Sequence, residues 1–334
     1  MTMPAVVLTA DGQIALQDRP RPRLQPGQVL VEVDLCGICG SDLHASQLPQ
    51  VYRGDCILGH ESTGRIAAVG HDVADWAIGQ RVAVNPNGNV DGTCVYCRSG
   101  RPNFCRQATL ETALGLQADG GLAPLMAAFP GHLRRIPDEL GTLEAAWVEP
   151  TATALRAVDL AGELWGRTVL VTGGGPIGQL ASRLAHLRSP ARILLMEPAA
   201  QRAEFAEASH AVSIAADADT SGPEVDVVLE CSGSAAATSA ALKLLAPGGI
   251  LVVVGAGPDP GLDSATILLK EITVRGSYIY NDEFDRAIEL LAAGQIAVAD
   301  LTTVISPLAD ALTAFDALRA GRVMKALIAP ATQP

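Results

Sequence analysis

Hydrophobic and polar positions alternate over short runs in the first 145 residues of the chain. Residues 29–33 (VLVEV) and 64–69 (GRIAAV) are two such runs, and turn signals such as Pro-Gly and Gly-His-Asp bound them. A period of two predicts strands with one buried face. We therefore expect this segment to be β-rich and to form a compact, partly closed barrel.

From about residue 150 the pattern changes to short apolar strands that alternate with Ala-rich helices. The predicted strands are 168–172, 192–197, 226–230, 250–255 and 272–277, and the predicted helices are 176–187 and 235–245. This βαβ rhythm is typical of a parallel, doubly wound sheet. Beyond residue 281 the spacing predicts an amphipathic helix over 284–291, a second helix over 309–320 and a closing strand over 324–328.

Composition and charge narrow the class of protein. The 334 residues are enough for about two domains, and 49% are apolar and 18% charged, as in ordinary globular proteins. The net charge is −12 and Lys and Arg form no cluster, which argues against nucleic acid or an anionic membrane as a partner. The start of the chain lacks a basic, hydrophobic signal segment, so we expect a cytoplasmic protein.

The sequence GGGPIG at 173–178 fits the pattern G-x-G-x-x-G between a predicted strand and a predicted helix. In such a loop Gly173 allows the tight turn, and Gly175 lets the backbone approach a pyrophosphate. Gly178 lets the helix pack on the strand, and the helix that begins at Pro176 supplies partial positive charge. The motif therefore predicts a dinucleotide site, although Gly-rich turns also occur in sheets that bind nothing.

An acidic residue at the end of the next strand strengthens this interpretation. Glu197 follows Gly173 by 24 residues, where a carboxylate can accept hydrogen bonds from the adenosine ribose. The same carboxylate would repel a 2′-phosphate, so we expect NAD rather than NADP. Arg202, one helical turn further on, is the residue that could weaken this preference.

Cysteine and histidine positions suggest a catalytic zinc. Cys39, His60 and a carboxylate at Glu61 or Glu149 provide three protein ligands and leave one position open for water or substrate. By itself the set is weak evidence, because a lone Cys or His is more often a core residue. The C-x-x-C formed by Cys36 and Cys39 could equally be a redox pair.

A second group of cysteines lies in a Gly- and Asn-rich stretch. Asp91, Cys94, Cys97 and Cys105 have the close spacing of a closed structural zinc site, with an Asp where a fourth Cys is usual. Three thiols in such a loop are hard to explain as core packing. The spacing therefore favours a metal site, and the alternatives are a vestigial site or three free thiols.

In order and spacing, these motifs resemble the zinc-dependent medium-chain dehydrogenase/reductase family, particularly its sorbitol-dehydrogenase-like and bacterial secondary-alcohol branch. The resemblance extends over essentially the whole chain. It implies an α/β protein with a GroES-like β-rich catalytic domain of residues 1–150 and 282–334. A doubly wound Rossmann domain for NAD would comprise residues 151–281. It also implies a homodimer or homotetramer.

The resemblance also implies roles for the residues of the proposed zinc site. Cys39 and His60 would bind the catalytic zinc with Glu61 as a ligand. Glu149 would be a direct or water-mediated ligand and could exchange with Glu61 during turnover.

Four further residues match positions that handle the proton and the nicotinamide in this family. Ser41 would take the alcohol proton, and His44 would pass it to solvent by way of the cofactor ribose. Thr153 and Ile177 would contact the nicotinamide.

We therefore expect reversible hydride transfer between NAD and a small alcohol or polyol, with a ketone or aldehyde as the other substrate. One alternative is a zinc-dependent tailoring reductase of specialised metabolism that acts on a ketone, imine or conjugated alkene. Another is a zinc- and NAD-binding homologue without catalysis. The presence of Ser41, His44 and Glu61 argues against the last.

Overall fold

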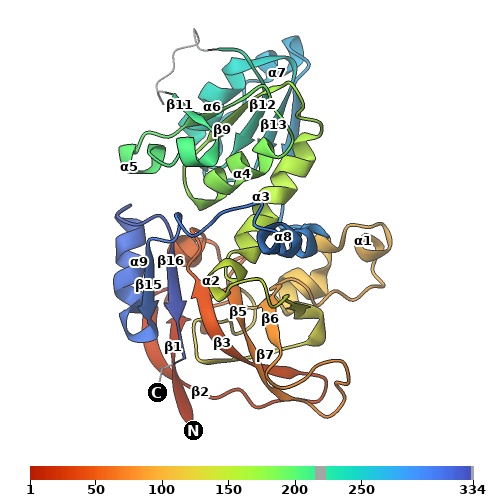
Figure 1. Ribbon diagram of the computed structural model, residues 1–334, viewed down its shortest axis with the longest axis vertical. Coiled ribbons are helices and arrows are strands. Elements are labelled where there is room, and N and C mark those ends of the chain that lie inside the picture. The colour runs from red at the N-terminus through yellow and green to blue at the C-terminus, as the bar shows by residue number, and fades with distance from the viewer. Residues whose placement is uncertain (215–222, 332–334) are drawn as a thin grey trace. The chain divides into compact units, whose positions relative to one another are not determined.

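The structure is a computed structural model that describes residues 1–214 and 223–331 (Figure 1). The chain divides into two compact units, one formed by Met1–Glu149 together with the residues from Phe284 onward, and one formed by Pro150–Glu283. The first unit is β-rich, and the second is a doubly wound α/β unit. The fold class predicted from the sequence is therefore confirmed.

A seven-stranded sheet forms the centre of the first unit. Its strands lie in the order β15-β16-β3-β5-β6-β8, and β7 pairs with β3. Their bounds are β3 (Val29–Gly37), β5 (Glu61–Val69), β6 (Arg81–Val84), β7 (Leu125–Ala128), β8 (Leu133–Arg135), β15 (Val304–Pro307) and β16 (Ala326–Ala329). The runs predicted at 29–33 and 64–69 lie within β3 and β5.

A three-stranded sheet and short helices complete this unit. The small sheet has the order β2-β1-β4, with β1 (Thr2–Leu8), β2 (Ile14–Pro20) and β4 (Cys56–Ile57). The helices are α1 (Val95–Arg98), α2 (Thr142–Ala145), α8 (Glu283–Ala292) and α9 (Ala311–Arg319). Single turns are η1 (Asp42–Gln47), η2 (Pro102–Phe104), η3 (Gln107–Glu111), η4 (Pro130–His132) and η6 (Leu308–Asp310).

Alternation along β3 builds the core of the first unit. Val29, Val31 and Val33 are buried while Glu32 is exposed, as expected for a strand with one face on the core. The antiparallel register of β3 and β5 places Gly37 opposite Glu61. The loop that leaves β3 and the residues that enter β5 therefore lie side by side, which brings the predicted zinc ligands together.

The second unit contains a six-stranded parallel sheet. Its order is β11-β10-β9-β12-β13-β14, which is 3-2-1-4-5-6 in chain order. The strands are β9 (Thr168–Thr172), β10 (Arg192–Met196), β11 (Val212–Ile214), β12 (Val225–Glu230), β13 (Leu245–Val253) and β14 (Thr273–Gly276). The helical segments are α3 (Val148–Ala161), α4 (Pro176–His186), α5 (Ala200–Ala203), η5 (Glu207–Ser209), α6 (Ala235–Leu244) and α7 (Ser264–Leu269).

Some elements differ from the sequence-based prediction. The helix α3 and the strands β11 and β15 were not predicted, and β13 begins at Leu245 rather than at residue 250. The central strands are apolar along their length because helices cover both faces of a parallel sheet. No helix within residues 1–214 and 223–331 has the length and hydropathy needed to cross a bilayer.

Candidate active site, cofactor loop and second metal site

Three of the predicted zinc ligands come together in the first unit. Cys39 follows β3, His60 precedes β5 and Glu61 begins β5. One donor atom from each of these side chains lies within 4.8 Å of the others. His60 and Glu61 are buried, and Cys39 is half-buried. The set offers a thiolate, an imidazole and a carboxylate, which are the donor types that zinc prefers.

A hydrogen-bond network supports the cluster from the loop after β3. Asp42, which is fully buried, accepts a hydrogen bond from the main-chain N–H of Cys39 at 2.9 Å. Its other oxygen lies 3.4 Å from Nδ1 of His60. That same oxygen also accepts a hydrogen bond from the hydroxyl of Tyr52 at 3.0 Å. The Tyr52 hydroxyl lies 2.8 Å from Oγ of Ser41, so the predicted relay serine belongs to this network.

The electrostatics of this cluster favour a cation. Burial alone would lower the pKa of His60, but the neighbouring charges of Asp42 and Cys39 raise it well above its ordinary value. Nδ1 of His60 is buried and makes no hydrogen bond of good geometry. The cluster therefore fits a positively charged group, which is either a proton on the imidazole or a metal ion.

A buried lysine that the sequence analysis did not identify contacts the cluster. Nζ of Lys325 forms an ion pair with Oε2 of Glu61, and both residues are 2% exposed. The ammonium also lies 5.6 Å from the centroid of the Trp147 ring. A Cβ at Gly37 would lie 2.1 Å from Oε2 of Glu61, so only glycine leaves room for this carboxylate. The sequence offers one weak signal, since Lys325 is among only three lysines in the chain.

The remaining predicted residues of this site lie around the cluster. Glu149 is half-buried at the second position of α3, and its charge contributes to raising the pKa of Lys325. It does not belong to the group of donors within 4.8 Å that the described residues form. His44 lies in η1 and is exposed, whereas Ser41 is half-buried.

Cys36, the other half of the C-x-x-C, lies in the core. It is fully buried and accepts a hydrogen bond from the Ser62 hydroxyl at 3.3 Å. Burial raises the pKa of its thiol to about 12. A thiol this hard to ionise is a poor nucleophile, so the environment favours a structural neighbour of the site over a redox pair with Cys39.

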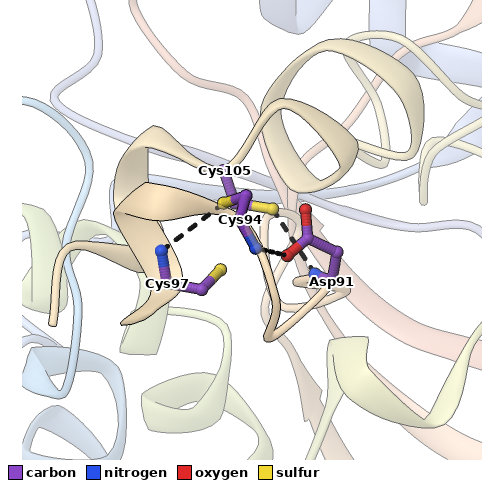
Figure 2. A group of neighbouring side chains, drawn as sticks. All are labelled: Asp91, Cys94, Cys97 and Cys105. Atoms are coloured by element: carbon purple, nitrogen blue, oxygen red, sulfur yellow. Dashed lines mark hydrogen bonds between the residues drawn. The ribbon is translucent and has the colours of Figure 1, made fainter. Parts of the chain in front are cut away.

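Asp91, Cys94, Cys97 and Cys105 form a second cluster of donors within 4.8 Å of one another. Figure 2 shows the three sulfur atoms and the carboxylate around a common space. Oδ1 of Asp91 accepts hydrogen bonds from the main-chain N–H of Thr93 and of Cys94, both at 2.7 Å. This turn fixes the carboxylate beside the thiols, where Asp91 can act as the fourth ligand.

The ionisation of the second cluster also suits a metal. The N–H groups of Cys94 and Thr93 lower the pKa of Asp91 to about 2. The main-chain N–H of Cys97 lowers the pKa of the Cys94 thiol, whereas burial raises that of Cys97 to about 12. Without a metal, ionisation of Cys94 is therefore favoured over that of Cys97, and a bound cation would stabilise both thiolates. The four residues fit a closed zinc site.

The predicted dinucleotide loop has the geometry that the motif requires. Gly173 has φ +85°, and a Cβ there would lie 2.7 Å from the Cα of Ser232. A Cβ on Gly178 would lie 1.8 Å from the carbonyl oxygen of Gly173, so the third glycine allows the helix to approach. Around Gly175 no described atom lies within 4 Å of such a Cβ, which leaves the space over the start of α4 at Pro176 open to a ligand.

Glu197 is fixed at the end of β10, next to this loop. Its Oε2 accepts a hydrogen bond from the N–H of Gly174 at 2.7 Å, and its Oε1 accepts one from the N–H of Ala199 at 2.8 Å. Gln179, which the sequence analysis missed, is fully buried and donates to the carbonyl oxygens of Gly174 and Arg202. It thus ties the loop to α5, which carries Arg202.

The two residues expected to contact the nicotinamide belong to helices of the second unit. Thr153 lies in α3 and Ile177 is the second residue of α4, and both are half-buried. Neither is packed away in the core, so both side chains are accessible to a ligand.

Comparisons with known families agree with this geometry. The alcohol dehydrogenase GroES-like domain matches residues 25–138, and the zinc-binding dehydrogenase family matches residues 176–293. These matches bear out the GroES-like fold of the first unit. They also fit the presence of zinc sites and of NAD(P) binding.

Individual relatives match over nearly the whole chain. The protein named Probable D-xylulose reductase A from Aspergillus fumigatus is 33% identical, with 97% of this chain and 95% of the relative covered. Sorbitol dehydrogenase from Gallus gallus is 30% identical with the same coverage. The crystal structure of a zinc-binding dehydrogenase from Sinorhizobium meliloti 1021 bound to NADP is 31% identical, has a TM-score of 0.89 and covers 99% of this chain and 100% of its own.

Proposed function

The chain belongs to the zinc-dependent medium-chain dehydrogenase/reductase family, in the branch similar to sorbitol dehydrogenase and xylulose reductase, and we propose that it oxidises a small polyol or secondary alcohol with NAD. The observation that carries this proposal is the cluster of Cys39, His60 and Glu61. A buried site with three such donors matches the ligand number of a catalytic zinc and leaves one position for a substrate oxygen.

The residues of the first unit would hold the metal, and their contacts would determine which side chains bind it permanently and which can exchange. Cys39 and His60 would be permanent ligands, while Glu61 and Glu149 would alternate as the third. When bound, zinc polarises the alcohol oxygen and lowers the pKa of its hydroxyl. Lys325 competes for the Glu61 carboxylate, and this competition would keep Glu61 exchangeable.

The proton of the alcohol would leave through Ser41. The Ser41 hydroxyl is held by Tyr52 at 2.8 Å, which orients it while Asp42 accepts the Tyr52 proton in a hydrogen bond. His44 is exposed at the same turn and would deliver the proton to solvent. NAD held at the loop 173–178 would supply the hydride acceptor, so oxidation of the alcohol would give a ketone or aldehyde. The reverse sequence would reduce the carbonyl.

Glu197 supports NAD as the cofactor. Its carboxylate is only 9% exposed and is anchored to two main-chain N–H groups, so it cannot swing away from a 2′-phosphate. We expect kcat/KM to favour NAD in the wild type, and Glu197→Ser to narrow the difference. Arg202→Ala is the matched control, because it removes the cation that α5 places next to this loop. A wild-type preference for NADP would show that Arg202 outweighs the carboxylate.

A panel of alcohols, polyols and ketones with NAD(H) and NADP(H) tests the proposal directly. NADH formation with polyols or secondary alcohols is the expected result. Activity confined to imines or conjugated alkenes would favour the tailoring reductase instead. Failure of every alcohol and carbonyl compound with the zinc-loaded protein would contradict the proposed function.

The free edge of the parallel sheet suggests a homodimer. All four residues of β14 are exposed, and an edge strand presents unpaired main-chain groups to another chain. Leu268 and Leu269 of the preceding helix are 76% and 82% exposed. We infer that a second copy covers this edge, which is also compatible with a tetramer built from two dimers. Val274→Pro should shift sedimentation toward the monomer, and a monomeric wild type would disprove the inference.

A further inference from the structure

A buried glutamate organises the turn that follows β12. Glu230 is the last residue of this strand, and its side chain is 1% exposed. Its Oε1 accepts hydrogen bonds from the N–H of Ser232 at 2.8 Å, the hydroxyl of Ser232 at 2.5 Å and the N–H of Gly233 at 3.0 Å. Thr172, the last residue of β9, donates its hydroxyl to the same oxygen at 3.3 Å. One buried carboxylate oxygen thus fixes the turn and joins it to the neighbouring strand.

Glycines let this turn touch the loops on both sides. A Cβ on Gly173 would lie 2.8 Å from the main-chain nitrogen of Ser232. On the other side, a Cβ on Gly255 would lie 2.2 Å from the nitrogen of Gly233, and a Cβ on Gly257 would lie 1.8 Å from its carbonyl oxygen. The backbones of three loops are therefore in direct contact, so a shift of the central turn would move its neighbours.

The position of these loops in the sheet indicates what they face. They follow β9, β12 and β13, and the strand order reverses between β9 and β12. In doubly wound sheets the dinucleotide binds outside the carboxyl ends of the strands at this reversal. The adenosine half lies toward β10, where Glu197 is located, so the loops after β12 and β13 face the nicotinamide half.

We propose that Glu230 is a positioning residue for the nicotinamide half of the cofactor. It makes its hydrogen bonds to the turn 231–233 rather than to the cofactor, and it holds that turn against Gly173 and the loop after β13. A carboxyl oxygen can accept several hydrogen bonds at once, which suits a residue that must hold the main chain of a turn in one place. The inference rests on the proposed dinucleotide binding and adds to that site a residue that positions its backbone.

The test compares NAD with AMP, which carries only the adenosine half. Binding of each to the zinc-loaded full chain is measured by calorimetry. Glu230→Ala should raise the Kd for NAD by about tenfold or more. The Kd for AMP should rise severalfold less, because AMP would meet only the loop 173–178 and not the loops after β12 and β13. Glu230→Gln keeps an oxygen acceptor at the same place, so it should recover most of the NAD affinity. A purely structural role would weaken both nucleotides together.

A second variant moves the same turn without changing Glu230. Gly233 has φ +65°, and a Cβ there would lie 2.6 Å from the carbonyl oxygen of Ala256, so Gly233→Ala should reproduce the selective loss of NAD. The matched control is Ser234→Ala, which removes the hydroxyl that caps α6 through the N–H of Ala237. Ser234→Ala should lower Tm without weakening the binding of NAD.

The possible results separate the inference from the proposed function. Unchanged NAD affinity in both Glu230→Ala and Gly233→Ala would overturn the role of Glu230, and so would equal losses for NAD and AMP. A wild-type protein that binds neither nucleotide would instead overturn the proposed function, and the inference would fall with it.

Discussion

The ion pair between Lys325 and Glu61 allows a quantitative test of how the catalytic cluster is held together. Both residues are 2% exposed, so neither charge can be solvated if its partner is removed. Removing one partner of a buried ion pair costs about 3–5 kcal/mol, because the remaining charge is left unpaired. We therefore expect Lys325→Met, which keeps most of the length of the side chain, to lower the free energy of unfolding of the zinc-free protein by roughly this amount.

Bound zinc should reduce this loss. A cation beside Glu61 replaces the charge that Lys325→Met removes, so the variant should lose less stability with zinc than with a chelator. Urea unfolding followed by circular dichroism measures both states. In the zinc-free protein, Glu61→Gln combined with Lys325→Met removes both charges, and the double variant should be more stable than Lys325→Met alone by about 2 kcal/mol.

The same pair predicts an alkaline change in stability. Burial would lower the pKa of Lys325, but the charges of Glu61 and Cys39 raise it above the ordinary 10.5. A group whose pKa is raised on folding stabilises the protein fully below its unfolded pKa and loses that contribution as pH rises through the folded pKa. The free energy of unfolding of the zinc-free wild type should therefore fall above pH 10.5. The part of this fall that comes from Lys325 should be absent in Lys325→Met. Two results would refute the reasoning about this ion pair. One is a free energy of unfolding of zinc-free Lys325→Met within about 1 kcal/mol of wild type, and the other is that the losses from Glu61→Gln and Lys325→Met add strictly in the double variant.

Three further predictions concern the metals and the proton. Cys39→Ala should remove the catalytic zinc and most of kcat without unfolding the protein, because a three-ligand site tolerates no loss of a strong donor; full activity after loss of one zinc equivalent would exclude the metal mechanism. Ser41→Ala should slow alcohol oxidation by about 10²–10⁴-fold, whereas His44→Gln should cost less and respond to buffer bases, since this residue is exposed. Undiminished oxidation by Ser41→Ala would mean another route for the proton. Asp91→Ala should retain kcat and lose the second zinc and some thermal stability. If the wild type held about one zinc per chain instead of about two, and the thiols of Cys94, Cys97 and Cys105 titrated as free, the second cluster would be an abandoned site.

Features encoded over short stretches could be predicted from the sequence. The loop 173–178 carries its own turn and helix signals, and the spacing of 91–105 brings four donors within reach of one metal. The strand pattern at 29–33 also fixed which face is buried. In each case the information lies within one or two neighbouring elements, so no long-range packing had to be known.

Features that depend on tertiary packing could not be predicted. Lys325 pairs with Glu61 across 264 residues, and nothing local marks a lysine as buried. Tyr52 and Gln179 are common residue types whose roles depend on which loops they join. The helix α3 was missed because Pro150 is its third residue and four of its nine buried positions are alanine, so its apolar periodicity is weak. Proline is tolerated in a first helical turn, where its missing N–H has no partner to lose.

The balance of charge in the catalytic cluster leads to a last prediction. With zinc bound, Cys39 would be a thiolate and Asp42 and Glu61 carboxylates, so the cluster would hold three negative charges against the single positive charge of Lys325. A divalent metal would bring the sum to zero with His60 neutral. Without metal, the neighbouring Asp42 and Cys39 raise the pKa of His60 well above its ordinary value, although burial alone would lower it.

Zinc binding should therefore displace a proton from His60. The raised pKa favours a proton on the metal-free imidazole, and a ligand must be deprotonated to bind, so zinc affinity should rise with pH until the metal-free His60 has titrated. Calorimetry of zinc binding in buffers of different ionisation enthalpy measures the released protons. Asp42→Asn is the informative variant, because it removes one of the charges that hold the proton on His60, at 3.4 Å from Nδ1. It should reduce proton release at neutral pH; equal release by Asp42→Asn and wild type would show that Asp42 does not set the protonation of His60.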